Sequence, residues 1–116
     1  AFPEYAQADT DMTNLHCSFL GAPSIRWEDG TEVRLPTRHE TALLAYLMVE
    51  QERPHPRAAL TNLLWGEKSE KSARNSLRQT LFRLRQALAP GEAGQPFLHI
   101  SPRSVQFNPQ SRHTLD

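Results

Sequence analysis

The segment 71–88 limits most strongly what this chain can fold into. At about 100° per residue, five of its apolar side chains fall within about 40° of one line, which predicts an amphipathic helix. A stripe of this kind has to be buried against other parts of a fold. Ala89-Pro90-Gly91 then ends the helix. The stripe consists of Ala73, Leu77, Leu81, Leu84 and Leu88.

The opposite side of the same helix carries amides, and both flanks carry guanidinium or hydroxyl groups. Asn and Gln match the edge of adenine and Arg matches that of guanine, while Ser and Arg at the margins suit phosphate oxygens. The helix is therefore expected to enter a DNA major groove. Asn75, Gln79, Phe82 and Gln86 lie opposite the stripe, Arg74, Arg78 and Arg85 on one flank, and Ser72, Ser76 and Arg83 on the other.

Cations near the start of this helix point the same way. The positive end of the helix dipole makes Lys71 and Arg74 unfavourable there. A phosphate bound at this end would make the same two cations favourable. Local pairing is the alternative, because Glu67 and Glu70 stand four residues before these cations. The predicted base contacts are Asn75, Arg78 and Gln79, and the predicted backbone contacts on this helix are Lys71, Ser72, Arg74 and Arg83.

Phe82 is an aromatic residue on the outward side, where its own helix cannot bury it. It can contact a thymine methyl group, meet a partner subunit, or pack beneath another part of the fold. Packing under the wing or against the core is the expectation.

Short strands are predicted at the start of the chain. Apolar and polar residues alternate over 15–20 and 25–28, Asp29-Gly30 favours a tight turn, and a third strand is expected over 31–35. The three form an antiparallel sheet. Residues 1–13 show no sustained period, so we expect a tail over 1–13 and one domain over 14–116.

Two helices are predicted between this sheet and segment 71–88. Thr37 and Glu40 have the spacing of a capping box, and Pro54 ends the first helix. Pro56 can start the second, which closes at Trp65. The expected apolar stripe of the second helix is Ala59, Leu60, Leu63 and Leu64.

A hairpin is predicted near the end of the chain. Strand patterns over 97–100 and 105–107 flank a turn at 101–104, and Arg103 in this turn either reaches a minor groove or phosphate or is simply solvated. The whole order is sheet, three helices, hairpin. It predicts an α+β fold, a winged helix-turn-helix with an N-terminal antiparallel sheet and a C-terminal β-hairpin wing.

The net charge of zero hides an asymmetry along the chain. Segment 1–52 has nine acidic and three basic residues, a net charge of −6, whereas 53–88 has eight basic and two acidic residues, a net charge of +6. This favours either a surface that faces a polyanion or two segments that neutralise each other in the fold.

Other classes of protein are disfavoured. Cys17 is the single cysteine, and strand alternation predicts that it is buried, as we also expect of Trp27 and Trp65. The five histidines lack metal-ligand spacing, and no nucleotide-binding or nucleophile motif occurs. We expect no metal, no cofactor and no enzymatic activity. Without a membrane-spanning run or a signal peptide, a cytoplasmic location is expected.

Short motifs follow one another in a specific order: LPTR at 35–38, ALLAYL at 42–47, RPH at 53–55, LLW at 63–65, ARNSLRQ at 73–79 and LRQAL at 84–88. In this order they resemble the N-terminal DNA-binding domain of SARP-type bacterial transcriptional activators, a winged helix similar to those of OmpR and PhoB response regulators. The resemblance runs from about residue 15 to 116.

The resemblance implies that 71–88 is the recognition helix and 97–107 the wing. It implies a loop that faces RNA polymerase, and binding as a tandem dimer to direct-repeat promoter DNA by a protein that is monomeric when free. Residues 107–116 resemble the junction with a following helical domain. Two residues depart from the family: Pro56 replaces a Ser or Thr cap, and Phe82 replaces a smaller or polar residue. The loop residues are Gly66, Glu67, Lys68 and Ser69.

Sequence-specific binding of double-stranded DNA in bacterial transcription regulation is therefore the main functional hypothesis. The alternative is a winged-helix module that binds protein and not DNA. A contiguous apolar patch around Phe82 would favour the alternative, and a continuous positive surface would favour DNA.

Overall fold

The computed structural model describes residues 14–92 and 95–116, so the predicted tail over 1–13 lies outside the described residues. None of the described helices is long and apolar enough to cross a bilayer. In chain order the elements are β1 (Leu15–Ser18), β2 (Ser24–Trp27), α2 (Arg38–Val49), β3 (His55–Pro56), α3 (Arg57–Trp65), α4 (Glu70–Leu88), the 3-10 helix η1 (Ala89–Gly91), β4 (Leu98–Ile100), β5 (Ser104–Phe107) and β6 (His113–Leu115).

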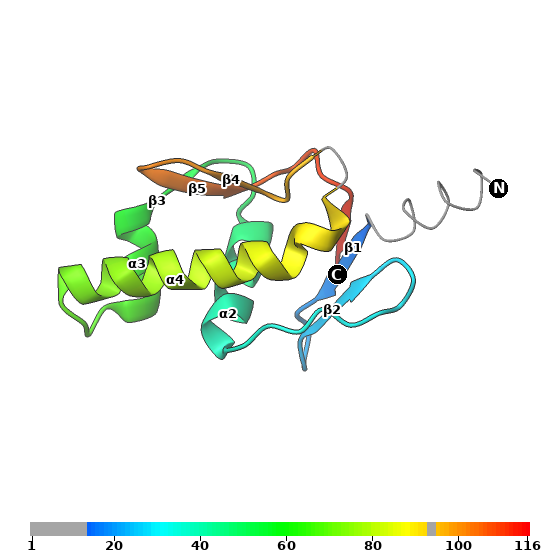
Figure 1. The fold of residues 1–116 in the computed structure, drawn as a ribbon, viewed down its shortest axis with the longest axis horizontal. Coiled ribbons are helices and arrows are strands. Elements are labelled where there is room, and N and C mark those ends of the chain that lie inside the picture. Colours follow the sequence, from blue (N-terminus) through cyan, green and yellow to red (C-terminus); the bar gives the residue numbers. More distant parts are fainter. Residues whose placement is uncertain (1–13, 93–94) are drawn as a thin grey trace.

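Helix α4 runs along the longest axis of the fold (Figure 1). Helices α2 and α3 pack on α4, and β5 of the β4–β5 hairpin packs on α2, so that all of these elements share one core with the buried side of α4. β3 joins the hairpin in a sheet ordered β3-β5-β4, while a second sheet lies near the end of α4. The predicted α+β winged helix-turn-helix is confirmed, with α3 and α4 as the helix pair and β4–β5 as the wing.

The N-terminal sheet differs from the prediction in its third strand. Its order is β2-β1-β6, and β6 runs parallel to β1 with His113 opposite Leu15. His16 Nδ1 lies 2.6 Å from Thr114 Oγ1, and His16 Nε2 lies 3.1 Å from Glu28 Oε1. One imidazole therefore joins β1 to β6 and to the end of β2. Residues at the predicted junction with another domain are thus part of this sheet.

The segment 31–35, predicted as the third strand, makes a single bridge between Arg26 and Glu32. The turn before it forms as predicted, and Gly30 adopts a φ of 91°, a left-handed conformation that glycine accepts without strain. Pro36 follows the segment and has no N–H with which to extend a ladder. The chain therefore leaves the sheet and leads into α2.

Helix α2 begins as predicted. Thr37 is its N-cap, and the capping box is complete, because Glu40 Oε1 accepts the Thr37 N–H at 2.6 Å while Thr37 Oγ1 accepts a backbone N–H of the helix. The helix ends at Val49, earlier than the predicted stop at Pro54. Residues 50–54 instead form the turn that carries the chain to β3.

Helix α3 starts directly after Pro56, as predicted, and no side chain caps it. Its predicted apolar stripe is wrong in part, because Ala59 is exposed and Leu63 is 54% exposed. This short helix packs on the rest of the fold through one narrow face, so residues just off that face point to solvent. Its buried side chains are Leu60, Thr61 and Trp65.

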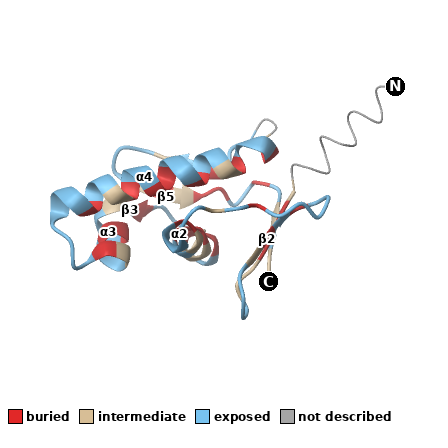
Figure 2. Cartoon of the chain, turned by 60° about the horizontal axis from the view of Figure 1, so that its bottom comes forward, coloured by how far each residue is buried: buried red, intermediate tan, exposed pale blue. Residues whose placement is uncertain are grey.

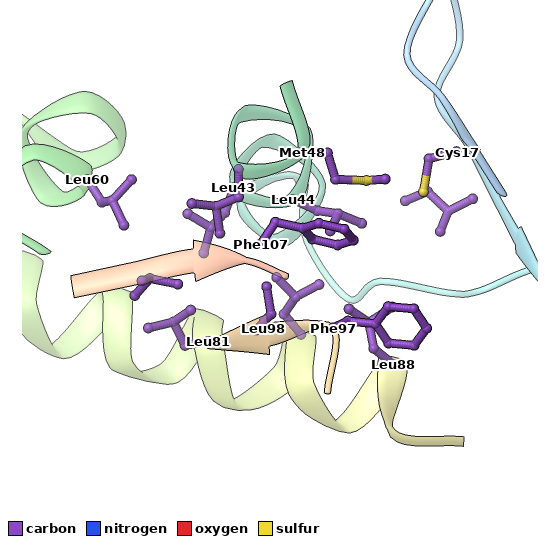
Figure 3. Close-up of a cluster of buried hydrophobic side chains, with 14 of the residues drawn as sticks. Cys17, Leu43, Leu44, Met48, Leu60, Leu81, Leu88, Phe97, Leu98 and Phe107 are labelled. Carbon is purple, nitrogen blue, oxygen red and sulfur yellow. The ribbon is translucent and has the colours of Figure 1, made fainter. Parts of the chain in front are cut away.

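The leucine stripe of α4 is buried as predicted, and no member of it is more than 4% exposed. Leu43 and Leu44 of α2 and Phe107 of β5 lie in the same cluster (Figure 3). Burying one leucine side chain contributes roughly 1.5–3 kcal/mol. Rotation of α4 would therefore expose several such side chains. Cys17, Trp27 and Trp65 are buried, as predicted.

A buried carboxylate links α2 to α4. Glu40 is fully buried, and its Oε1 accepts from the N–H and Oγ1 of Thr37. Its Oε2 makes no hydrogen bond, but Arg83 Nη1 lies 3.6 Å away. Because a buried charge is costly without a counter-charge, the half-exposed Arg83 compensates the carboxylate of Glu40.

Loss of this counter-charge should destabilise the fold. We expect Arg83→Met to lower the free energy of unfolding by about 1–3 kcal/mol in urea denaturation. Arg85→Met is the matched control, since Arg85 is exposed on the same helix, and its effect should stay within about 0.5 kcal/mol. In a Glu40→Gln background the cost of Arg83→Met should shrink. Equal effects of Arg83→Met and Arg85→Met would contradict the interpretation.

Stability should also fall at high pH through Cys17. Burial raises the pKa of the Cys17 thiol to about 12, against about 8.5 in an unfolded chain. Below about pH 8.5 both states keep the proton, and above it the unfolded state loses its proton first, so the thiol's contribution declines by up to about 1.4 kcal/mol per pH unit. Urea unfolding of the protein and of Cys17→Ala should show a stability difference that shrinks as pH rises. A constant difference would count against this.

Candidate nucleic-acid interface

The outward side of α4 is open to solvent along the helix (Figure 2). The helix starts one residue earlier than predicted, because Ser69 is its N-cap and accepts a backbone N–H of the first turn at 3.3 Å. The three candidates for base contact, Asn75, Arg78 and Gln79, are all exposed. Core packing therefore turns these side chains away from the rest of the fold.

Two of these candidates are hydrogen-bonded to each other. Arg78 Nη2 donates to Asn75 Oδ1 at 2.7 Å. The Asn75 amide N–H groups and the other N–H groups of Arg78 remain for a ligand. Gln79 makes no side-chain hydrogen bond to any described residue, so both ends of its amide are available. The three side chains together present donors and acceptors of the kind that base edges require.

The cations at the start of α4 are exposed and are not paired locally. Over residues 14–92 and 95–116, Lys71 forms no ion pair with Glu67, and Arg74 forms none with Glu70. The alternative of local pairing therefore does not describe this structure. A hollow beside the first turns of α4 is lined by Ser69, Lys71, Ser72, Arg74, Asn75 and Arg78.

The loop 66–69, for which a role in facing RNA polymerase is expected from the sequence, is exposed throughout. The residue before it, Trp65, is buried and stacks on His39 of α2 with ring centroids 5.0 Å apart. Lys68 Nζ donates to Ser76 Oγ of α4 at 3.0 Å. The loop is therefore anchored at both ends while its surface faces solvent.

Arg57 fastens the wing to the start of α3. Its backbone N–H donates to the Arg103 carbonyl at 2.9 Å, and its Nε donates to the Ser101 carbonyl at 3.0 Å. Arg103 itself is exposed in the turn of the wing. The turn is thereby held beside the N-terminus of α3.

A second hollow connects the wing to α4. Arg57 of α3, Arg74 and Arg78 of α4 and Pro102 of the wing all line it, together with the acidic Glu70. Arg57 is absent from the predicted contacts, and no sequence signal identifies it, because its partners are backbone carbonyls of the wing. Three guanidinium groups therefore border one region between α3, α4 and the wing.

On α4, the structure contradicts the prediction for Phe82 and gives Arg83 an additional role. Phe82 is 61% exposed, so the expectation that it packs under the wing or against the core is wrong. Arg83, a predicted backbone contact, pairs with the buried Glu40 and is 42% exposed at its side chain. The exposed part of Arg83 is still accessible to a ligand.

The positive charge of segment 53–88 stays at the surface. Within the described residues, Arg83 is the one basic side chain of this segment that pairs with an acidic side chain. The acidic and basic segments therefore do not neutralise each other contact by contact. This favours a surface that faces a polyanion.

Comparisons with known proteins agree with this geometry. The family described as "Transcriptional regulatory protein, C terminal" matches residues 30–103. The regulatory protein AfsR of Streptomyces coelicolor is 30% identical over 89 residues, which cover 77% of this chain and 9% of AfsR. The solved structure of Mycobacterium tuberculosis EmbR in complex with a low affinity phosphopeptide has a TM-score of 0.68 and 28% identity, covering 82% of this chain and 25% of that chain.

The family match spans well over half of this chain and includes α2, α3, α4 and the start of the wing. The chain spans less than a tenth of AfsR and a quarter of the EmbR chain. The chain therefore belongs to the family of transcriptional regulatory protein C-terminal domains and is the OmpR/PhoB-type winged-helix DNA-binding domain of a SARP-type transcription regulator.

Proposed function

We propose that residues 14–116 form a domain that binds double-stranded DNA sequence-specifically, with α4 in the major groove and the wing, residues 97–107, on the adjacent backbone or minor groove. One observation carries the proposal: α4 buries its leucines and leaves an amide and guanidinium face exposed beside a wing that Arg57 fastens in place.

The contacts divide by chemistry. Asn75, Arg78 and Gln79 read base edges, because their exposed amide and guanidinium groups match adenine and guanine. Residues at the starts of α3 and α4, on the flank of α4 and in the wing contact phosphates, which fixes register without reading sequence. The proposed backbone contacts are Arg57, Lys71, Ser72, Arg74, Arg83 and Arg103.

The loop 66–69 is proposed as the surface that faces RNA polymerase. It is exposed and lies between α3 and α4. The protein is monomeric when free and binds direct repeats in promoter DNA as a tandem dimer; this completes the proposal.

A protein-binding module without DNA function is the second candidate. The exposed Phe82 favours it, as does the phosphopeptide bound in the EmbR complex. Against it, none of the other large apolar side chains exposed in the described ranges lies on α4: Leu20 is in the loop after β1, Val49 on α2 and Leu63 on α3. The outward face of α4 is therefore polar and cationic around one aromatic residue.

Alanine at a base-reading residue should weaken and broaden DNA recognition. With a site selected from random DNA, Asn75→Ala, Arg78→Ala and Gln79→Ala should each cost about 1–3 kcal/mol of binding and relax discrimination at one base pair. Because Arg78 bonds to Asn75, the double variant should lose less than the sum of the two. Fluorescence anisotropy measures both effects.

Arg34→Ala is the matched control, because Arg34 is an exposed arginine outside this face. It should bind the selected site as the unchanged protein does. Selection that yields no site, or alanine variants that bind with unchanged affinity, would instead favour the protein-binding module.

Affinity should also depend steeply on salt. If about five phosphates are neutralised, binding should weaken roughly 10²–10³-fold between 50 and 200 mM salt. Arg74→Ala should reduce the slope of log affinity against log salt by about one, whereas Gln79→Ala should leave it unchanged. An affinity independent of salt would contradict phosphate neutralisation.

A further inference from the structure

Phe82 is the one large apolar residue that α4 exposes. It is 61% exposed, and in the described part of the chain its ring takes part in no aromatic contact. Neither the fold nor the proposed hydrogen-bonding contacts give it a role. The remaining question is which ligand group a lone phenyl ring in this position would contact.

The position of Phe82 on α4 places it beside the base-reading residues. It follows Asn75 by two helical turns, about 10.5 Å along the axis, and so lies on the same side of the helix as Asn75. Side chains of a helix lean toward its N-terminus, so the ring of Phe82 covers the surface next to Arg78 and Gln79. Both residues are exposed, as is Phe82.

The chemistry of the surroundings favours nucleic acid over a protein partner. Arg78, Arg85 and Gln86 lie near Phe82 on the helix, and α4 has no acidic residue after Glu70. A contiguous exposed apolar patch marks a protein interface, and on α4 the exposed ring of Phe82 stands alone among polar and cationic side chains. In the major groove, the apolar group that base edges present is the C5-methyl of thymine.

We propose that Phe82 contacts the 5-methyl group of one thymine in the bound DNA and so determines specificity at that base pair. The inference rests on the proposed DNA binding and adds a contact by apolar packing to those made by hydrogen bonds.

Replacement of thymine by deoxyuridine tests this contact, because uracil lacks only the methyl group. Each thymine of the selected site is replaced in turn, and binding is measured by fluorescence anisotropy. At one thymine the unchanged protein should lose about fourfold in affinity, the value of one buried methyl group. Phe82→Ala should bind the thymine site more weakly and should bind the thymine and uracil sites equally.

Two further variants make the result specific. Phe82→Leu keeps apolar bulk and should keep part of the discrimination, whereas Val49→Ala removes an exposed apolar side chain of α2 and should keep all of it. The inference would be overturned if replacing thymine by deoxyuridine weakened binding equally in the unchanged protein and in Phe82→Ala. It would also be overturned if no such replacement changed the affinity of the unchanged protein. DNA binding that survives in either case leaves the proposed function standing, while failure to select any site refutes both.

Discussion

Burial of the leucine side of α4 is the constraint on which the rest of the molecule depends. With Leu77, Leu84 and their neighbours inside the core, α4 cannot rotate about its axis without moving apolar surface into water. The side opposite the core is thereby held outward. Two tethers add to this: Arg83 reaches the carboxylate of Glu40 on α2, and Arg57 bonds to the turn of the wing. The geometry of the proposed DNA-binding surface is therefore set by the same packing that stabilises the fold.

Features that depend on neighbours in sequence could be predicted. The period of α4 identifies its buried side without knowledge of any partner, because side chains three and four apart share a face of a helix. The capping box of Thr37 and Glu40, the turn at Gly30 and the start of α3 after Pro56 are local in the same way. The exposure of the candidate base contacts follows from the same period. Whether those side chains bind bases is decided by the proposed experiments.

Features that depend on distant segments could not be predicted. The three residues of β6, His113–Leu115, are too few to show an alternation, and nothing in them identifies β1 as their partner. The ion pair of Arg83 with Glu40 joins two helices, so a view of α4 alone assigns Arg83 to solvent or ligand. Arg57 acts through carbonyl groups of the wing, and backbone partners leave no trace in residue type. The exposure of Phe82 depends on how far the wing extends over α4, which no local pattern contains.

The parallel strand β6 also determines when the domain can be finished. Thr114 meets His16 across 98 positions of the chain, and a two-stranded hairpin such as β1–β2 is marginal alone in water. Pairing over so long a loop is slow, because chain entropy is lost before the contact forms. A nascent chain on the ribosome therefore has its helices and wing available before its first sheet can close. We expect assembly to proceed from α2, α3, α4 and the wing outward, with β6 pairing with β1 only after these elements have formed.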